Sequence, residues 1–289
     1  MRQLLAADII MFNDVGVGPN SDANATSYVA NGTASGLLRN VDTGELTGNT
    51  LATAHVGAAF GTGGNAPLGS TDAATIFNGF VDFGSGTDSI IEIVGADSYT
   101  HTLSGLDAAN RFDVAATAIR GNQVYVNRWT LLSLEGAESF TSSHSAGPGI
   151  VTDGLAENQV AVWTGSNYLD DQGFVAQWLD IDPGADGEFE IVSQQYTGPT
   201  PGVGNGTANG IAGYAVSGLR FIEHDFDTAT VSNTPASSVL ATSAEIGAIV
   251  TDTGGLDPAL TMYWGTSNGG TNAANWDSSI ALGEVGVGT

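Results

Sequence analysis

Short apolar runs separated by glycine, asparagine and aspartate recur along the whole 289-residue chain, and this pattern restricts the fold more than any other feature. No window carries a sustained apolar stripe with the 3.6-residue period of an amphipathic helix. Short strands with regular turn residues between them are typical of an all-β fold. We therefore predict an antiparallel, jelly-roll-like β-sandwich, with strands over 9–12, 76–83, 89–94, 99–103, 111–119, 129–134, 159–163, 174–181, 188–194 and 213–223, and weaker strand signals near 27–29, 36–41 and 51–60.

Alternation within the strands predicts which side chains face the core. Phe112, Val114 and Ala116 fall on one face of their strand, because successive side chains of a strand point to opposite sides. Phe189 and Ile191 alternate with acidic residues in the same way. Both strands are expected to have one buried and one more polar face.

The charge of the chain excludes several classes of partner. It has 31 acidic residues against six arginines, no lysine, and a net charge of -25. Such a charge repels phosphate backbones and anionic lipids, so we expect no nucleic acid binding and no membrane insertion. The absence of cysteine excludes disulfides and thiolate metal sites, but it is compatible with secretion.

A change in composition near residue 226 divides the sequence into two predicted domains, 1–225 and 226–289. In the second, strands are expected over 228–231 with 238–240, 244–251 and 260–264. An immunoglobulin-like sandwich needs about seven strands. We therefore expect 226–289 to be a partial immunoglobulin- or fibronectin-like sandwich.

Two regions of the chain carry resemblances to known families. Arg111-Phe-Asp-Val-Ala-Ala-Thr-Ala-Ile-Arg120 and Val175-Ala-Gln-Trp-Leu-Asp-Ile-Asp-Pro-Gly-Ala-Asp-Gly-Glu-Phe189, within 89–224, resemble malectin-like or carbohydrate-binding-module β-sandwiches of large secreted bacterial proteins. Met262-Tyr-Trp-Gly-Thr-Ser-Asn-Gly-Gly270 and Asn275-Trp-Asp277 look like parts of a fibronectin type III-like module. The first resemblance implies a secreted or cell-surface glycan-binding protein, and the second implies a spacer.

Aromatic residues in and near one loop are the predicted glycan site. Trp163, Asn167, Tyr168 and Asp170 surround a turn, where rings can cover the apolar face of a sugar and polar groups can bond its hydroxyls. Trp129 and Trp178 can extend this platform. The alternative is that each tryptophan is a core residue, which the strand positions of Trp129 and Trp178 favour.

An acidic turn is the predicted metal site. Asp180, Asp182 and Asp186 lie in a segment with two glycines, and calcium takes six to eight oxygen ligands. The spacing departs from an EF-hand loop. A simple acidic β-turn is the more common use of such a sequence, so a structural Ca²⁺ and a metal-free turn both remain open.

These features support three hypotheses for function. The first is a non-catalytic extracellular glycan-binding or adhesion module whose partner is a polysaccharide. The second is a subunit of an extracellular fibre, which self-associates through open strand edges with residues 4–12 as the donated strand. The third is a fragment of a glycan-active enzyme, although the four histidines show no metal-ligand spacing.

Overall fold

The computed structural model describes residues 8–14, 34–57, 59–61, 63–83, 90–121, 127–201, 212–224, 229–254 and 257–288. They belong to two compact units, one spanning Asp8–His224 and the other formed in the described part by 229–254 and 257–288. Each unit is built from antiparallel strands, which confirms the predicted all-β class. The helices in the described part of the chain are all too short or too polar to span a bilayer.

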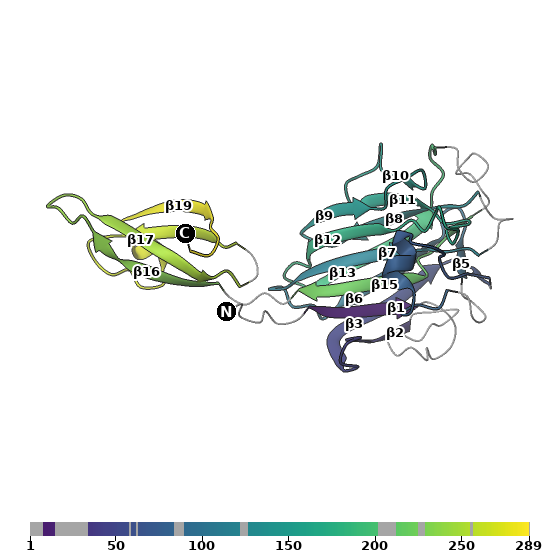
Figure 1. The fold of residues 1–289 in the computed structure, drawn as a ribbon, viewed down its shortest axis with the longest axis horizontal. Helices are drawn as coiled ribbons and strands as arrows, with labels where there is room; N and C mark the ends of the chain where they lie inside the picture. The colour runs from purple at the N-terminus through teal and green to yellow at the C-terminus, as the bar shows by residue number, and fades with distance from the viewer. Residues whose placement is uncertain are drawn as a thin grey trace. The chain divides into compact units, whose positions relative to one another are not determined.

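The first unit is a β-sandwich of two antiparallel sheets (Figure 1). One sheet has five strands in the order β1-β15-β7-β12-β9, namely β1 (Ile9–Asp14), β15 (Gly218–His224), β7 (Arg111–Thr117), β12 (Ala176–Asp182) and β9 (Ser139–His144). The other has seven strands in the order β10-β11-β8-β13-β6-β3-β2, namely β10 (Ile150–Val151), β11 (Gln159–Trp163), β8 (Trp129–Glu135), β13 (Glu188–Gln195), β6 (Ser98–Ser104), β3 (Leu46–Val56) and β2 (Ala34–Arg39). A smaller sheet of β14 (Gly213–Tyr214), β5 (Ile90–Ile93) and β4 (Ala59–Gly61) accompanies them.

The main hydrophobic core contains side chains from both large sheets. Phe112, Val114 and Ala116 of β7 are buried in it, as their alternation predicts, together with Phe189 and Ile191 of β13. The rings of Phe112 and Phe189 meet edge to face with centroids 6.2 Å apart. This cross-sheet contact joins the two layers of the sandwich.

A short helix replaces one predicted strand. The range 76–83 was expected to be extended, but α1 (Asp72–Phe77) is helical and a turn follows it. The hydroxyl of Thr71 caps the helix by accepting a hydrogen bond from the Ala74 amide, and Asp72 lies in the first turn. Phe77 packs with Ala115 of β7 in a second core cluster, so the helix covers the outer face of the five-stranded sheet.

The N-terminal strand belongs to this sandwich. β1 pairs with β15 from Ile9 opposite Glu223 to Asp14 opposite Gly218. Met11 and Phe12 are buried, one in each of the two largest core clusters. Residues 9–12 of the predicted donor strand therefore already complete a sheet of their own chain, and residues 4–7 lie outside the described residues.

The second unit consists of two hairpins. β16 (Thr230–Ser237) pairs with β17 (Glu245–Asp252), and β18 (Ala259–Trp264) pairs with β19 (Ser278–Glu284). A short 3₁₀ turn, η2 (Ala273–Asn275), precedes β19. Strand β19 had no counterpart in the prediction, and the predicted extension over 238–240 is not a strand.

Candidate functional site

The tryptophans of the predicted sugar platform lie in the core. Trp129 and Trp178 have no exposed surface, and Trp163 is 7% exposed. Trp163 stacks on Trp129 with ring centroids 6.4 Å apart. Tyr196 also packs against Trp129, with ring centroids 6.5 Å apart. Trp129 and Trp178 are therefore core residues, in agreement with the alternative that their strand positions favour.

The loop between Trp163 and Asp170 folds inward. Asn167 is fully buried, and its amide nitrogen donates to the carbonyls of Ala118 and Phe174 at 3.2 and 3.0 Å. Its amide oxygen accepts a hydrogen bond from the Phe174 nitrogen at 2.7 Å. Tyr168 packs on the second core cluster, and Asp170 alone of the six predicted residues is exposed. The Asn167 side chain thus fixes the loop through its hydrogen bonds to backbone groups.

The predicted acidic turn does not gather its carboxylates. Asp182 forms an ion pair with Arg111 at 2.8 Å through one oxygen and accepts the Gly184 amide with the other. Asp180 and Asp186 are exposed. Among the residues that the structure describes, no three His, Cys, Asp or Glu side chains form a group that could hold a metal ion. The calcium hypothesis therefore finds no ligand set at Asp180, Asp182 and Asp186 in this arrangement.

A buried carboxylate lies at the edge of the sandwich, in a place that the prediction did not single out. Glu223, near the end of β15, is 7% exposed. Its two oxygens accept hydrogen bonds from the amide nitrogens of Asn110 and Asn49, each at 2.7 Å. A buried charge normally requires such bonds, because transfer out of water is costly. The two amides thus hold the carboxylate in one position.

This carboxylate lines an open hollow of about 380 Å³, called here the Glu223 hollow. Beside the apolar Ile9 and Leu46, its wall carries the polar residues Asn40, Thr43, Glu45, Thr47, Asn49 and Asp107. Glu45 and Asp107 are exposed at its rim. Among the described residues that line it, none is basic. The hollow therefore offers several hydrogen-bond acceptors in a negative field.

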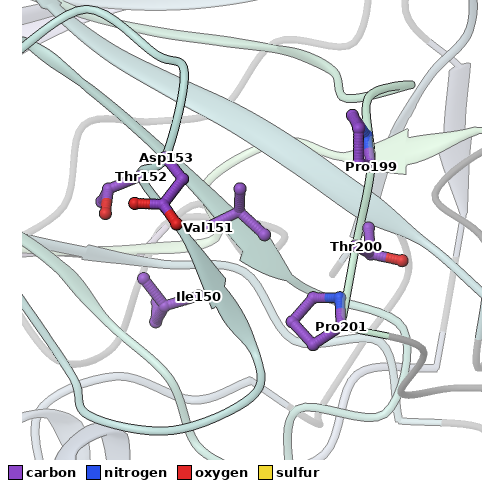
Figure 2. A pocket seen from close by; sticks show the side chains of 7 residues that line it. All are labelled: Ile150, Val151, Thr152, Asp153, Pro199, Thr200 and Pro201. Atoms are coloured by element: carbon purple, nitrogen blue, oxygen red, sulfur yellow. The ribbon is translucent and has the colours of Figure 1, made fainter.

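A second hollow lies beside edge strand β10. It has a volume of about 310 Å³, and Figure 2 shows Ile150, Val151, Thr152 and Asp153 on one side and Pro199, Thr200 and Pro201 on the other. The Tyr196 hydroxyl donates to the Pro199 carbonyl at 3.0 Å and so fixes the second side. Asp153 is exposed. Polar and apolar groups share its wall, and among the described residues that line it Asp153 is the one charged side chain.

A histidine bridges two carboxylates at the end of β15. The ring nitrogens of His224 lie 3.0 Å from Asp8 and 3.2 Å from Asp113. Partial burial alone would lower the pKa of His224, but the hydrogen bonds and charges of Asp8 and Asp113 raise it above its ordinary value. Folding therefore favours the protonated ring.

This pair predicts a pH dependence with a definite sign. A raised pKa in the folded state stabilises the protein fully below the ordinary histidine pKa of about 6.5, and the contribution disappears as pH rises through the folded pKa. We expect a loss of about 0.5 kcal/mol in the free energy of unfolding over that range, as for other partly exposed pairs. Urea unfolding of the wild type and His224→Gln on both sides of the transition checks this; an equal pH slope in both would contradict it.

The sequence contains a signal for the Glu223 hollow. Leu219 and Phe221 face the core from β15, and Glu223 continues their alternation, so an acidic residue occupies a core-facing position. Asn49 follows the same rule beside Leu51 in β3. A polar residue in phase with a buried face is thus a sequence signal for this hollow, independent of the aromatic residues.

Comparison with known proteins gives no relative from which to carry over a site. A scan against models of protein families, a search of curated proteins and a search of solved structures each find no match for this chain.

Proposed function

We propose that the first unit binds a neutral saccharide reversibly in the Glu223 hollow, and that the chain is a non-catalytic, extracellular glycan-binding module. The observation that carries this proposal is the buried Glu223 carboxylate, whose two oxygens are held by Asn49 and Asn110. A carboxylate oxygen keeps acceptor capacity after one such bond. The fixed oxygens can therefore accept further hydrogen bonds from ligand hydroxyls without reorganisation.

Charge and size support a neutral sugar. Glu45, Asp107 and Glu223 make the hollow repulsive to anionic ligands, so uronic acids and sulfated sugars fit it poorly. Hydroxyl groups can donate to all three carboxylates. A volume of about 380 Å³ lies in the lower part of the range of small-molecule sites and suits one or two sugar rings.

The test is a saccharide-binding measurement with a rim variant. We expect the wild-type chain to bind at least one polysaccharide on an array of neutral polysaccharides. Calorimetry with that polysaccharide should then show about tenfold weaker binding for Asp107→Ala than for the wild type. Asp107 is exposed, and among the described residues its side chain bonds only to the nearby Ala109 amide. Its loss should therefore leave the sandwich folded, which the melting temperature can verify.

Asp153→Ala is the matched control, because it removes an exposed aspartate from the second hollow (Figure 2). We expect its affinity to equal that of the wild type. If Asp153→Ala weakens binding and Asp107→Ala does not, the saccharide binds beside β10 and the proposal is wrong in its site. If no neutral saccharide binds, the proposed function itself is wrong.

A further inference from the structure

A groove runs between the two hairpins of the second unit. Two adjoining hollows of about 250 Å³ each share Asn233 of β16, Met262 and Tyr263 of β18, and Trp276. Because β16–β17 residues form one wall and β18–β19 residues the other, the hollows are one continuous groove. It will be called the hairpin groove.

The walls of the hairpin groove are apolar side chains that water still reaches. Val231, Ile246, Tyr263, Trp264 and Leu282 are each between 39% and 48% exposed. Among the described residues of this unit, Val250 alone is a fully buried hydrophobic residue. Two-stranded hairpins are marginally stable without a further packed layer, and exposed apolar patches mark interaction sites. The groove is therefore an apolar surface that a further packed layer could cover.

The described residues of this unit carry negative charge and no positive charge. Residues 229–288 contain five carboxylates and no lysine, arginine or histidine. Asp277 lies at the groove, since a Cβ added to the groove-lining Gly265 would stand 3.1 Å from its carboxylate. The Thr266 amide and hydroxyl bond this carboxylate at 2.6 and 2.9 Å and lower its pKa.

A second carboxylate is placed at the same end of the groove. Glu245 begins β17 just before the groove residue Ile246, so its side chain points to the opposite face of the strand. There it accepts hydrogen bonds from the hydroxyls of Ser237 and Ser238 at 2.9 and 3.0 Å. The exposed ring of Trp264 lines this end as well. Carboxylates on the hairpins that form this end of the groove, together with an exposed indole, favour a partner that carries cationic side chains.

We propose that the hairpin groove binds an extended, basic-amphipathic segment of a partner protein, in which apolar and basic residues alternate. Its apolar side chains fill the groove, and its backbone extends a hairpin edge by strand addition. Its basic side chains meet Asp277, Glu245 and the face of Trp264. A second copy of this chain is a poor occupant, since its 31 acids and six arginines repel the same surface. A saccharide is a poor occupant too, because aliphatic residues such as Ile246 and Leu282 leave its hydroxyls unbonded.

The test uses the whole chain and two synthetic peptides of about eight residues. One alternates valine with lysine, and the other alternates valine with glutamate. We expect fluorescence anisotropy to show at least about tenfold tighter binding of the lysine peptide, with an affinity that falls as salt is added. Trp264→Ala and Glu245→Gln are each expected to weaken that binding by about fivefold to tenfold.

The controls distinguish binding in the hairpin groove from non-specific binding to exposed apolar residues. Leu240→Ala removes a residue that is 71% exposed but does not line the groove, and it should leave binding unchanged. Equal binding of the two peptides, or an equal effect of Leu240→Ala and Trp264→Ala, would overturn the proposal. Concentration-dependent dimers of the chain alone, lost in Trp264→Ala, would overturn it in favour of self-association. Saccharide binding lost in Trp264→Ala would overturn it in favour of a glycan groove.

Discussion

Trp178→Ala is expected to lower the free energy of unfolding of the β-sandwich by about 3–5 kcal/mol, the usual cost of truncating a buried tryptophan. Trp178 has no exposed surface and lies on β12, between β7 and β9 of the five-stranded sheet. Alanine would leave a cavity in the main core. For a unit of this size, calorimetry should show a melting temperature lower by about 6–20 °C.

Two further variants test whether the loss of stability comes from the cavity at Trp178. Trp178→Phe keeps most of the packing and removes an indole N–H that has no hydrogen-bond partner among the described residues, so we expect a loss of only about 1–2 kcal/mol. Trp264→Ala removes a tryptophan that is 42% exposed and should leave the sandwich transition unchanged. If Trp178→Ala kept the wild-type melting temperature but lost saccharide binding, the residue would belong to a ligand surface, as in the platform hypothesis.

The strands of the sandwich follow from local sequence rules wherever apolar and polar residues alternate. Phe112 and Phe189 show this, since their periodicity alone predicts the buried faces of β7 and β13. The rule fails for β9, whose sequence Ser-Phe-Thr-Ser-Ser-His has one large apolar residue and forms an exposed edge strand. It also fails for the apolar run near 76–83, which suits a strand or a helix equally. The cap of Thr71 and Asp72, just before that run, favours the helix.

The candidate site could be predicted only in part, because tertiary contacts create it. The in-phase position of Glu223 is visible in the sequence, but its partners Asn49 and Asn110 stand 174 and 113 positions away. The inward fold of the Trp163–Asp170 loop likewise depends on Asn167 reaching the Ala118 carbonyl. A tryptophan in a turn-rich segment is compatible with a core or with a sugar platform. Here the hydrogen bond from Asn167 to the distant Ala118 carbonyl holds the loop against the core.

Acidification is expected to destabilise the first unit through His101 by about 3 kcal/mol between neutral pH and about pH 4.5. The ring is completely buried on β6, and complete burial lowers the pKa of His101 to about 3. Neither ring nitrogen has a hydrogen-bond partner among the described residues. The unfolded chain binds a proton below about pH 6.5 while the folded chain does not, so stability falls by about 1.4 kcal/mol per pH unit in that interval.

His101→Leu isolates this contribution from the titration of the many carboxylates, which both proteins share. Leucine fills a similar space and leaves no buried nitrogen without a partner, so we expect the variant to be at least as stable at neutral pH. At about pH 4.5 its advantage over the wild type should grow by about 3 kcal/mol, measured as urea unfolding at both pH values. His144→Leu, at an exposed histidine of β9, should show no such growth. Parallel pH profiles of His101→Leu and the wild type would contradict the prediction, because they would require the buried ring to be protonated in the folded state.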